Sequence, residues 1–329
     1  MSCFRDTHSS RFALRALMLG VLLASACGHD SSPLADPDGG VDGNGEGDGG
    51  IIDPSAPDEV LFQAALADWN AMLYADAETK FDQLLAQYPD SPRRDNSAYL
   101  SGRCRYELLD FPGARDALVA MRQDYPTSPF AGAAAYFTGR ARYRLTPPDY
   151  AGAVLDFQSS LSEDPQGTFA DNAQYFLGRA YYQLADYTNA ITALTAFEAT
   201  YPNSTYVDNG NYYLGRCYFN QQDYSGALPH FQDVFETTDS IYADDAQFYI
   251  GRCHYGLGSL ATALGDFQDL ESGYAASQYV DNAIYYELRV YVDQIDCTNA
   301  NATYTRLETA FPTSNYLPLA QMYLTNGGC

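Results

Sequence analysis

A small residue recurs in this chain every 36 to 39 positions, and this period limits the possible fold more than any other feature. The positions are Ala65, Gly102, Gly139, Gly178, Gly215 and Gly251, with Leu288 in the seventh place. Self-similarity at such a period is typical of proteins built from stacked supersecondary units, each burying its apolar face against the next. The sequence therefore predicts a repeat architecture.

A second small residue follows each member of this column after twelve positions. It is found at Ala77, Ala114, Ala190, Ala227, Ala263 and Ala300, and it slips to Ala153 in the third copy, where Pro147 and Pro148 lengthen the turn. Twelve positions further on, a proline ends the unit at Pro89, Pro126, Pro202 and Pro312. In the lengthened copy this proline is Pro165, and two copies have no proline there. Small residues facing each other let two antiparallel helices approach closely, and proline stops the second helix.

An aspartate opens most of the predicted first helices, where we expect its carboxylate to cap free N–H groups. These residues are Asp95, Asp171, Asp208, Asp244 and Asp281. The pattern predicts an all-α chain of about seven helical hairpins over residues 59–324. Within it, residues 317–324 form a C-terminal cap helix, and residues 325–329 follow as a tail.

The run Leu177-Gly178-Arg179-Ala180-Tyr181, followed by Ala190, Leu194 and Pro202, resembles the tetratricopeptide signature L-G-x2-Y, A, P. The resemblance implies a right-handed α-solenoid. The long period, with tyrosine before proline at the hairpin ends (Tyr88, Tyr125 and Tyr201), resembles tetratricopeptide lipoproteins of the bacterial envelope. Two such groups are the BamD-like outer-membrane assembly proteins and the CpoB/YbgF-like proteins of the Tol–Pal system. The chain lacks the coiled coil of the second group and has an acidic tether that neither requires, so membership in either stays open.

The first 26 residues have the organisation of a signal peptide. Arg5, Arg11 and Arg15 precede an apolar stretch over residues 16–26 that is too short to span a bilayer. The following Leu23-Ala24-Ser25-Ala26-Cys27 resembles a bacterial lipobox, which implies that Cys27 carries the lipid. Plain secretion is the alternative. Together with the absence of a retention aspartate after Cys27, the resemblance favours the outer membrane, facing the periplasm.

Residues 27–58 differ in composition from the repeats. From residue 28 onward they contain eight acidic side chains and no lysine or arginine, so we expect a disordered tether. A calcium loop is the alternative, because Asp42, Asn44, Glu46, Gly47 and Asp53 fall near the spacing of such a loop, but its flanks are glycine and proline. After removal of the signal the chain has 18 − 3 = 15 basic and 42 − 1 = 41 acidic side chains, a net charge of about −26. This charge excludes nucleic acid as a partner.

Three columns of the first helices form one stripe, which in tetratricopeptide proteins lines the concave groove where ligands dock. The arginines are Arg103, Arg140, Arg179, Arg216, Arg252 and Arg289. The aromatic residues four positions earlier are Tyr99, Tyr136, Tyr175, Tyr212, Phe248 and Tyr285, and the amides are Asn172, Asn209 and Asn282. The stripe could bind a peptide or a glycan. Alternatively, each arginine stacks on its tyrosine and pairs with an acid of the next repeat, which would tie the repeats together.

The cysteines fall into two sets. Cys104, Cys217 and Cys253 share one column, too far apart for disulfides, and should be small buried residues. Cys297 is expected to end the last first helix and Cys329 to follow the cap helix beside it, so these two could form a disulfide in an oxidising compartment.

The sequence contains no arrangement typical of catalysis. His230 and His254 are the only histidines of the repeat region, and there is no phosphate-binding loop, nucleophile elbow or metal-ligand cluster. We therefore predict no enzyme, no cofactor and no metal. The predicted function is a lipid-anchored envelope scaffold that binds a protein or peptide. Peptidoglycan binding and an accessory role in an envelope complex are the alternatives.

Overall fold

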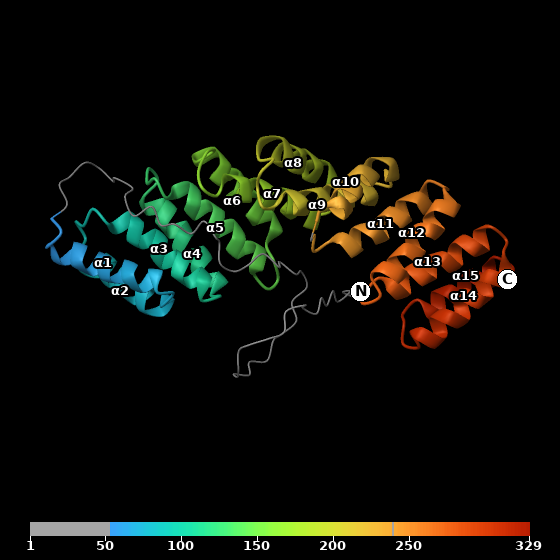
Figure 1. Cartoon of the computed structure of the whole chain (residues 1–329). Helices are drawn as coiled ribbons and strands as arrows, with labels where there is room; N and C mark the ends of the chain where they lie inside the picture. The colour runs from blue at the N-terminus through green and yellow to red at the C-terminus, as the bar shows by residue number, and fades with distance from the viewer. Residues whose placement is uncertain (1–52, 239) are drawn as a thin grey trace. The chain divides into compact units, whose positions relative to one another are not determined.

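The computed structural model describes residues 53–238 and 240–329, and all regular structure in these residues is helical. The chain divides into two compact units with a boundary at Gln221 and Gln222, inside the turn between helices α9 and α10. Figure 1 labels the helices in chain order. Residues 1–52, which include the predicted signal peptide, Cys27 and most of the tether, lie outside the described residues.

The N-terminal unit contains helices α1 to α9. Their bounds are α1 Pro57–Asn70, α2 Tyr74–Gln87, α3 Arg94–Glu107, α4 Phe111–Asp124, α5 Ala131–Arg144, α6 Tyr150–Glu163, α7 Ala170–Gln183, α8 Tyr187–Thr200 and α9 Val207–Asn220. Each helix packs against the next in the chain, and α3, α5, α7 and α9 also contact one another in succession. This is the arrangement of stacked hairpins that the period predicts.

The small residue of each first helix makes room for a large side chain of the second helix. A Cβ atom added to Gly178 would lie 2.5 Å from Cγ of Leu194, and one added to Gly102 would lie 2.6 Å from Cδ2 of Leu118. The alanine column is fully buried. The space beside each of these glycines, however, is occupied by the residue four positions after the alanine and not by the alanine itself. The hairpin is therefore closed by a leucine or phenylalanine that fits over the glycine.

The aspartates that occupy N-cap positions are not those that the sequence indicated. Asp171 lies inside the first turn of α7, and the N-cap residue, Phe169, makes no side-chain capping bond. One carboxylate oxygen of Asp171 accepts from the N–H of Asn172, and the other accepts from the hydroxyl of Ser204, 33 residues later. Side-chain capping is found at second helices, where Asp186 accepts from the N–H of Asn189. Asp171 therefore binds a free N–H of the first turn as predicted, but from inside the helix, because the turn between hairpins places Phe169 at the N-cap.

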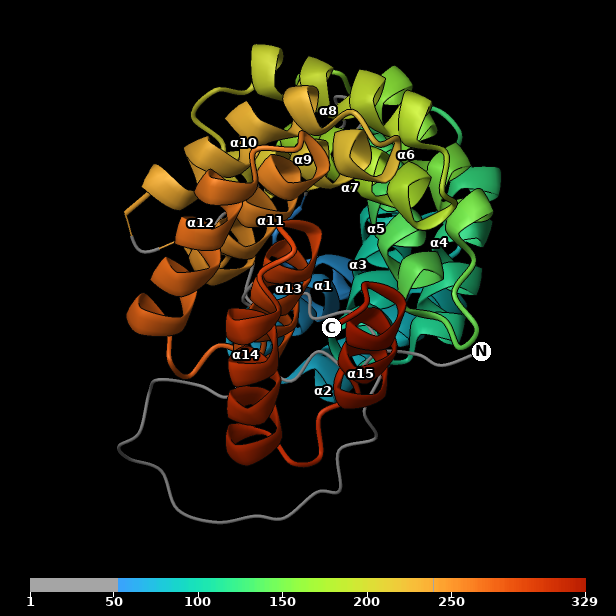
Figure 2. The same ribbon diagram turned by 90° about the vertical axis from the view of Figure 1, so that its right-hand side faces the viewer.

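The C-terminal unit contains α10 Tyr224–Glu236, α11 Ala243–Gly256, α12 Leu260–Gly273, α13 Val280–Asp293, α14 Cys297–Ala310 and α15 Leu317–Asn326. The last helix, α15, packs on both α13 and α14, and the three lie side by side in Figures 1 and 2. It buries Ala320 and Leu324, as expected of the predicted cap helix. The prediction that Cys297 ends a first helix was wrong, because Cys297 is the first residue of α14.

The predicted all-α fold of tetratricopeptide-like hairpins is confirmed. Among the described residues, no helix has the length and apolar content needed to cross a bilayer.

Candidate functional site

The arginine column of the first helices lies between aromatic rings of the neighbouring hairpins. In the N-terminal unit, Cζ of Arg103 is 3.6 Å from the ring centroid of Phe137 in the next hairpin and 5.2 Å from that of Trp69 in the previous one. Arg179 repeats this geometry, 4.9 Å from Tyr213 and 5.4 Å from Tyr143. A guanidinium over an aromatic face is attracted by the ring quadrupole, so Arg103 and Arg179 each bridge three consecutive hairpins.

Each arginine also contacts the aromatic column of its own helix. In three of them, Nη1 donates to the phenolic oxygen of the tyrosine four residues earlier. The distance is 3.1 Å from Arg103 to Tyr99, and it is 2.6 Å from Arg140 to Tyr136 and from Arg216 to Tyr212. The bond fixes the guanidinium plane, so that its faces are presented to the rings on either side. In the C-terminal unit Arg252 lies 5.1 Å from the ring of Tyr286, and Arg289 lies 4.8 Å from that of Tyr255.

The aromatic column stacks on the residue that precedes the next first helix. Tyr99 stacks on Phe130 with centroids 5.3 Å apart, and Tyr175 stacks on Tyr206 at 4.6 Å. The other stacked pairs are Tyr136 with Phe169, Phe248 with Tyr279, and Tyr285 with Tyr316. In the first hairpin the partner of Phe62 is not a second ring but the guanidinium of Arg93, whose Cζ lies 4.8 Å from the ring centroid of Phe62.

These contacts bury most of the predicted ligand-binding residues. Tyr136 and Tyr175 are fully buried, Phe248 nearly so, and Tyr99, Tyr212 and Tyr285 are buried. Such rings cannot stack on a sugar unless the hairpins separate, and the glycan alternative therefore loses its main support. Asn172 is buried, whereas Asn209 and Asn282 are half-buried. Of the arginines, Arg103 and Arg179 are buried, and the half-buried ones are Arg140, Arg216, Arg252 and Arg289.

Of the two hypotheses for the arginine column, the architectural one named the tyrosine of the same helix and an acid of a neighbouring repeat as partners, and neither hypothesis included two further aromatic columns. One lies two residues before the small residue, at Phe137, Phe176, Tyr213, Tyr249 and Tyr286, and the other lies four residues after it, at Trp69, Tyr106, Tyr143, Tyr182 and Tyr255. Both have the period of the glycine column and could have been found by the same alignment. We name the arginines together with these rings and the tyrosine column the arginine–aromatic ladder.

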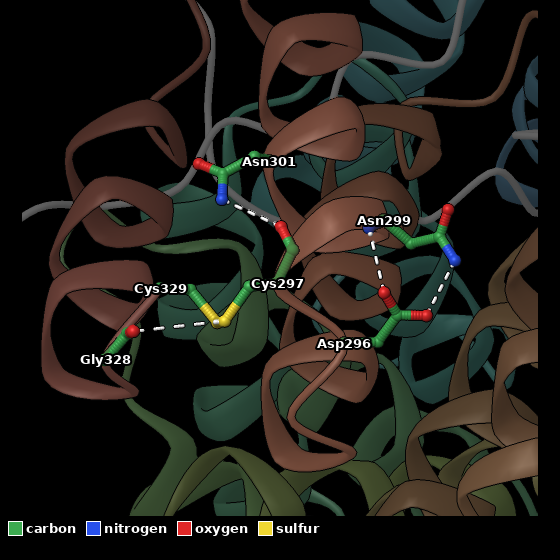
Figure 3. Close-up of a disulfide and its surroundings, with 6 residues drawn as sticks. All are labelled: Asp296, Cys297, Asn299, Asn301, Gly328 and Cys329. Carbon is green, nitrogen blue, oxygen red and sulfur yellow. Dashed lines mark hydrogen bonds between the residues drawn. A yellow bond between two sulfur atoms is a disulfide. The ribbon is translucent and has the colours of Figure 1, made fainter.

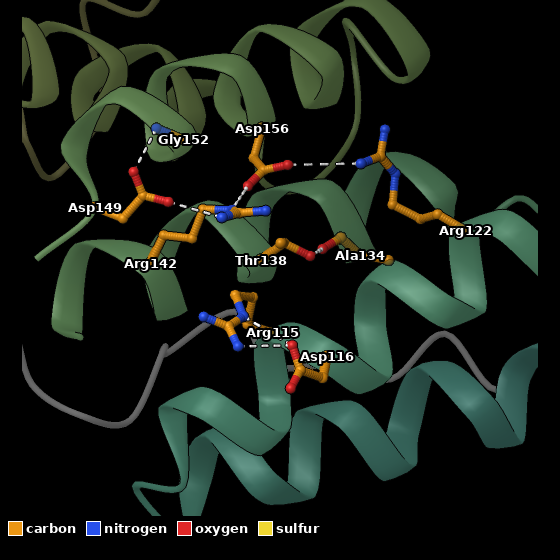
Figure 4. A network of polar contacts seen from close by, with 9 residues as sticks. All are labelled: Arg115, Asp116, Arg122, Ala134, Thr138, Arg142, Asp149, Gly152 and Asp156. Atoms are coloured by element: carbon orange, nitrogen blue, oxygen red, sulfur yellow. Dashed lines mark hydrogen bonds and ion pairs between the residues drawn. The ribbon is translucent and has the colours of Figure 1, made fainter.

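A separate polar network joins α4, α5 and α6 (Figure 4). Nε of Arg142 is 2.7 Å from Oδ2 of Asp156, and Nη1 of the same guanidinium is 2.7 Å from Asp149. Arg122 of α4 approaches the other oxygen of Asp156 at 3.7 Å. Burial raises the pKa of the Asp156 carboxyl, and the two guanidinium groups oppose this shift. The network crosses the hairpin with the longer turn and has a structural role.

A disulfide joins Cys297 to Cys329, with Cα atoms 5.0 Å apart (Figure 3). The structure thus brings together the two cysteines that the sequence had paired, at the first residue of α14 and the last residue of the chain. The bond holds the end of α15 against the last hairpin. Asp296, just before Cys297, caps α14 by accepting from the N–H of Asn299 at 3.1 Å.

The other three cysteines of the described residues are buried thiols. Burial raises the pKa of Cys104, Cys217 and Cys253 to about 12, which leaves them protonated and unreactive at neutral pH. Within residues 53–238 and 240–329 no group of three metal-ligating side chains is found.

Fold and ladder together define an α-solenoid protein of repeated helical hairpins, which is a class of binding scaffold. Residues 139–286 match the YfiO family of outer membrane lipoproteins, and residues 62–129 and 99–168 match a tetratricopeptide repeat family. The chain is therefore a tetratricopeptide-repeat protein that resembles the outer membrane lipoproteins. No curated protein matches it.

Solved structures share the fold. The C-terminal part of a tetratricopeptide protein from Cytophaga hutchinsonii has 18% identity and a TM-score of 0.62, over 79% of this chain and 98% of that one. A tetratricopeptide repeat protein from Parabacteroides merdae has 13% identity and a TM-score of 0.50, over 82% and 98%. YrrB, described as having an unusual peptide-binding site, has 16% identity and a TM-score of 0.50, over 63% and 99%. At these identities the likeness supports the fold alone.

Proposed function

We propose that the protein is a lipid-anchored scaffold of the bacterial envelope that binds a protein or peptide along its first helices. The observation that carries this proposal is the match of residues 139–286 to the outer membrane lipoprotein family. The lipobox-like sequence before Cys27 independently supports an anchor at the N-terminus. In this proposal the tether over residues 27–58 lets the repeats reach a partner away from the membrane surface.

The composition of the central first helices favours a partner segment with carboxylate groups. Arg140, Arg179 and Arg216 occupy the arginine column of α5, α7 and α9. The positions four residues later hold Arg144, Gln183 and Asn220, so neither column carries an acid there. Such a basic stripe stands out in a chain with 42 acidic and 18 basic residues. Arg179 is buried between rings, so the half-buried Arg140 and Arg216, together with the amide groups, would recognise carboxylates and the backbone of an extended peptide.

The anchor is tested by Cys27→Ser. The wild-type protein should fractionate with membranes and gain the mass of a lipidated N-terminal cysteine, and the variant should be released into the soluble envelope fraction. Retention of the variant in the membrane fraction, or a wild-type protein without the lipid mass, would contradict the anchor.

The binding face is tested by photo-crosslinking in cells. Gln183 is exposed at the end of α7, four residues after Arg179, and a photoreactive residue there should give a discrete adduct. The matched control is Thr192, which is exposed on the second helix α8. Equal adducts from both positions, or none from Gln183, would argue against binding along the first helices.

A further inference from the structure

The turn inside most hairpins holds one residue in the left-handed backbone region. These residues are Met72 with φ 58°, Leu109 with φ 63°, Ala185 with φ 58°, Gln222 with φ 62°, Gly258 with φ 76° and Ile295 with φ 60°. Glycine adopts this conformation without steric cost, whereas a side chain with Cβ is strained there and a β-branched one most of all. Only one of the six positions uses glycine.

The side chains at three of these strained positions are large, apolar and exposed. Met72 is 73% exposed and Leu109 is 56% exposed in the N-terminal unit, and Ile295 is 81% exposed in the C-terminal unit. They add little to the core, and glycine would remove the backbone strain. Neither packing nor local conformation explains them, and strain that folding does not need is a reason to look for a function.

Neighbouring residues extend the apolar surface within the N-terminal unit. Leu73, Leu108 and Leu184 are also exposed and lie in the same turns. Arg103 of α3 contacts Trp69 of α1, and α3, α5, α7 and α9 contact one another in succession, so the turns that follow the first helices come to the same end of the stack. Neighbouring turns are about 10 Å apart, and the turn between α5 and α6 separates the turn of Leu184 from that of Leu109. We name Met72, Leu73, Leu108, Leu109 and Leu184 the turn edge.

Acidic side chains follow the apolar residues of the turn edge, and the nearby Arg105 is already paired with Glu78 and Asp82. Asp76 is exposed in the first turn of α2, after Met72, and Asp110 is exposed directly after Leu109. Asp186, two residues after Leu184, is half-buried. Asp110 and Asp186 also cap the helices that follow them, and the negative charge of the three carboxylates would repel an acidic segment and attract a basic one. We propose that the turn edge docks an apolar segment of a partner protein that also carries lysine or arginine side chains. This surface is distinct from the arginine–aromatic ladder, which favours carboxylates.

Glycine substitution separates docking from folding. In Met72→Gly/Leu109→Gly the apolar side chains are lost but the strain is relieved, so the full chain should melt at the same or a higher temperature. Ala185→Gly is the matched control, because it changes the same backbone position but removes only a methyl group. The probe is a synthetic amphipathic helix of leucine and lysine, compared with one of leucine and glutamate.

The wild-type protein and Ala185→Gly should bind the leucine–lysine helix at 150 mM salt, and the double variant should bind it about tenfold more weakly, because two apolar contacts are lost. Equal binding by the double variant would overturn the proposal, since charge alone would then explain it. Equal binding of the leucine–glutamate helix would also overturn it. So would adsorption to phosphatidylethanolamine–phosphatidylglycerol vesicles by wild-type protein only, which would make the edge a lipid contact. None of these outcomes depends on crosslinking from Gln183.

Discussion

The arginine column has different surroundings in the interior of the N-terminal unit and at the end of the C-terminal unit. Arg179 is 3% exposed and lies between rings from the hairpins before and after it. Arg289 is half-buried, and on its far side it has only Tyr323 of the single helix α15, 4.8 Å away. In a repeat array most stabilisation comes from interfaces between neighbours, so the last hairpin has one such interface fewer.

Other interactions strengthen that end. Besides the disulfide, Tyr323 donates to Asp293 over 2.7 Å, which joins α15 to α13. Arg306 of α14 lies 2.7 Å from Glu287 of α13 and 3.0 Å from Glu271 of α12. The comparison teaches that inside the stack each ladder arginine is held by rings on both sides, whereas the end adds a covalent bond and polar contacts to a ladder with fewer neighbours.

Removal of the disulfide should have the largest effect. The bond closes a loop between residues 32 apart, so Cys297→Ser/Cys329→Ser should lower the stability of the last hairpin by about 3–4 kcal/mol. Hydrogen exchange should show α15 opening first. Reductant should reproduce the effect in the wild-type protein and have no further effect on the variant. Unchanged exchange in α15 would mean that noncovalent packing alone holds the end.

Truncation of the ladder arginine should cost more inside the stack than at its end. Arg179→Ala leaves a gap between two rings and should destabilise the protein by about 2–3 kcal/mol, against about 1 kcal/mol for the half-exposed Arg289→Ala. Denaturant unfolding of the two variants measures the difference. Equal effects would show that the second ring neighbour adds no stability.

The polar ties at the end should make it sensitive to pH. Glu287 is 1% exposed, and burial raises the pKa of its carboxyl to about 7, although Arg306 opposes the shift. In the unfolded chain this group has a pKa near 4.5, so the folded state holds the proton more tightly. The resulting stability is fully present below pH 4.5 and is lost as the pH rises through 7.

This single group should lower stability by about 2 kcal/mol between pH 5.5 and pH 8. Glu287→Gln should flatten that dependence, because the amide does not titrate. The measurement is thermal unfolding of both proteins across this range. A Gln variant with the wild-type slope would assign the pH dependence to other groups.

The helical period could be read from the sequence because stacking imposes one local solution on every copy. Gly178, Ala190 and Pro202 mark a first helix, a second helix and a stop, and α7 and α8 lie where these residues indicated. The Arg column was also visible, since a residue repeated at one helical position must face the same neighbours in each copy. Two local positions differed from the expectation: Asp171 lies inside the first turn of α7 rather than at its N-cap, and Cys297 begins a helix rather than ending one.

The tertiary structure decided what each repeated residue contacts. From the sequence, Tyr175 could equally face a ligand or the next hairpin, because periodicity gives a position on a helix but not the width of the space beside it. Packing fills that space with Tyr206, and it brings Tyr213 and Tyr143 to either side of Arg179. The exposed Leu109 at a left-handed turn likewise follows from backbone geometry, which no pattern of residue types specifies. Sequence therefore determined the hairpins, and close packing between them determined which of their faces are left for a partner.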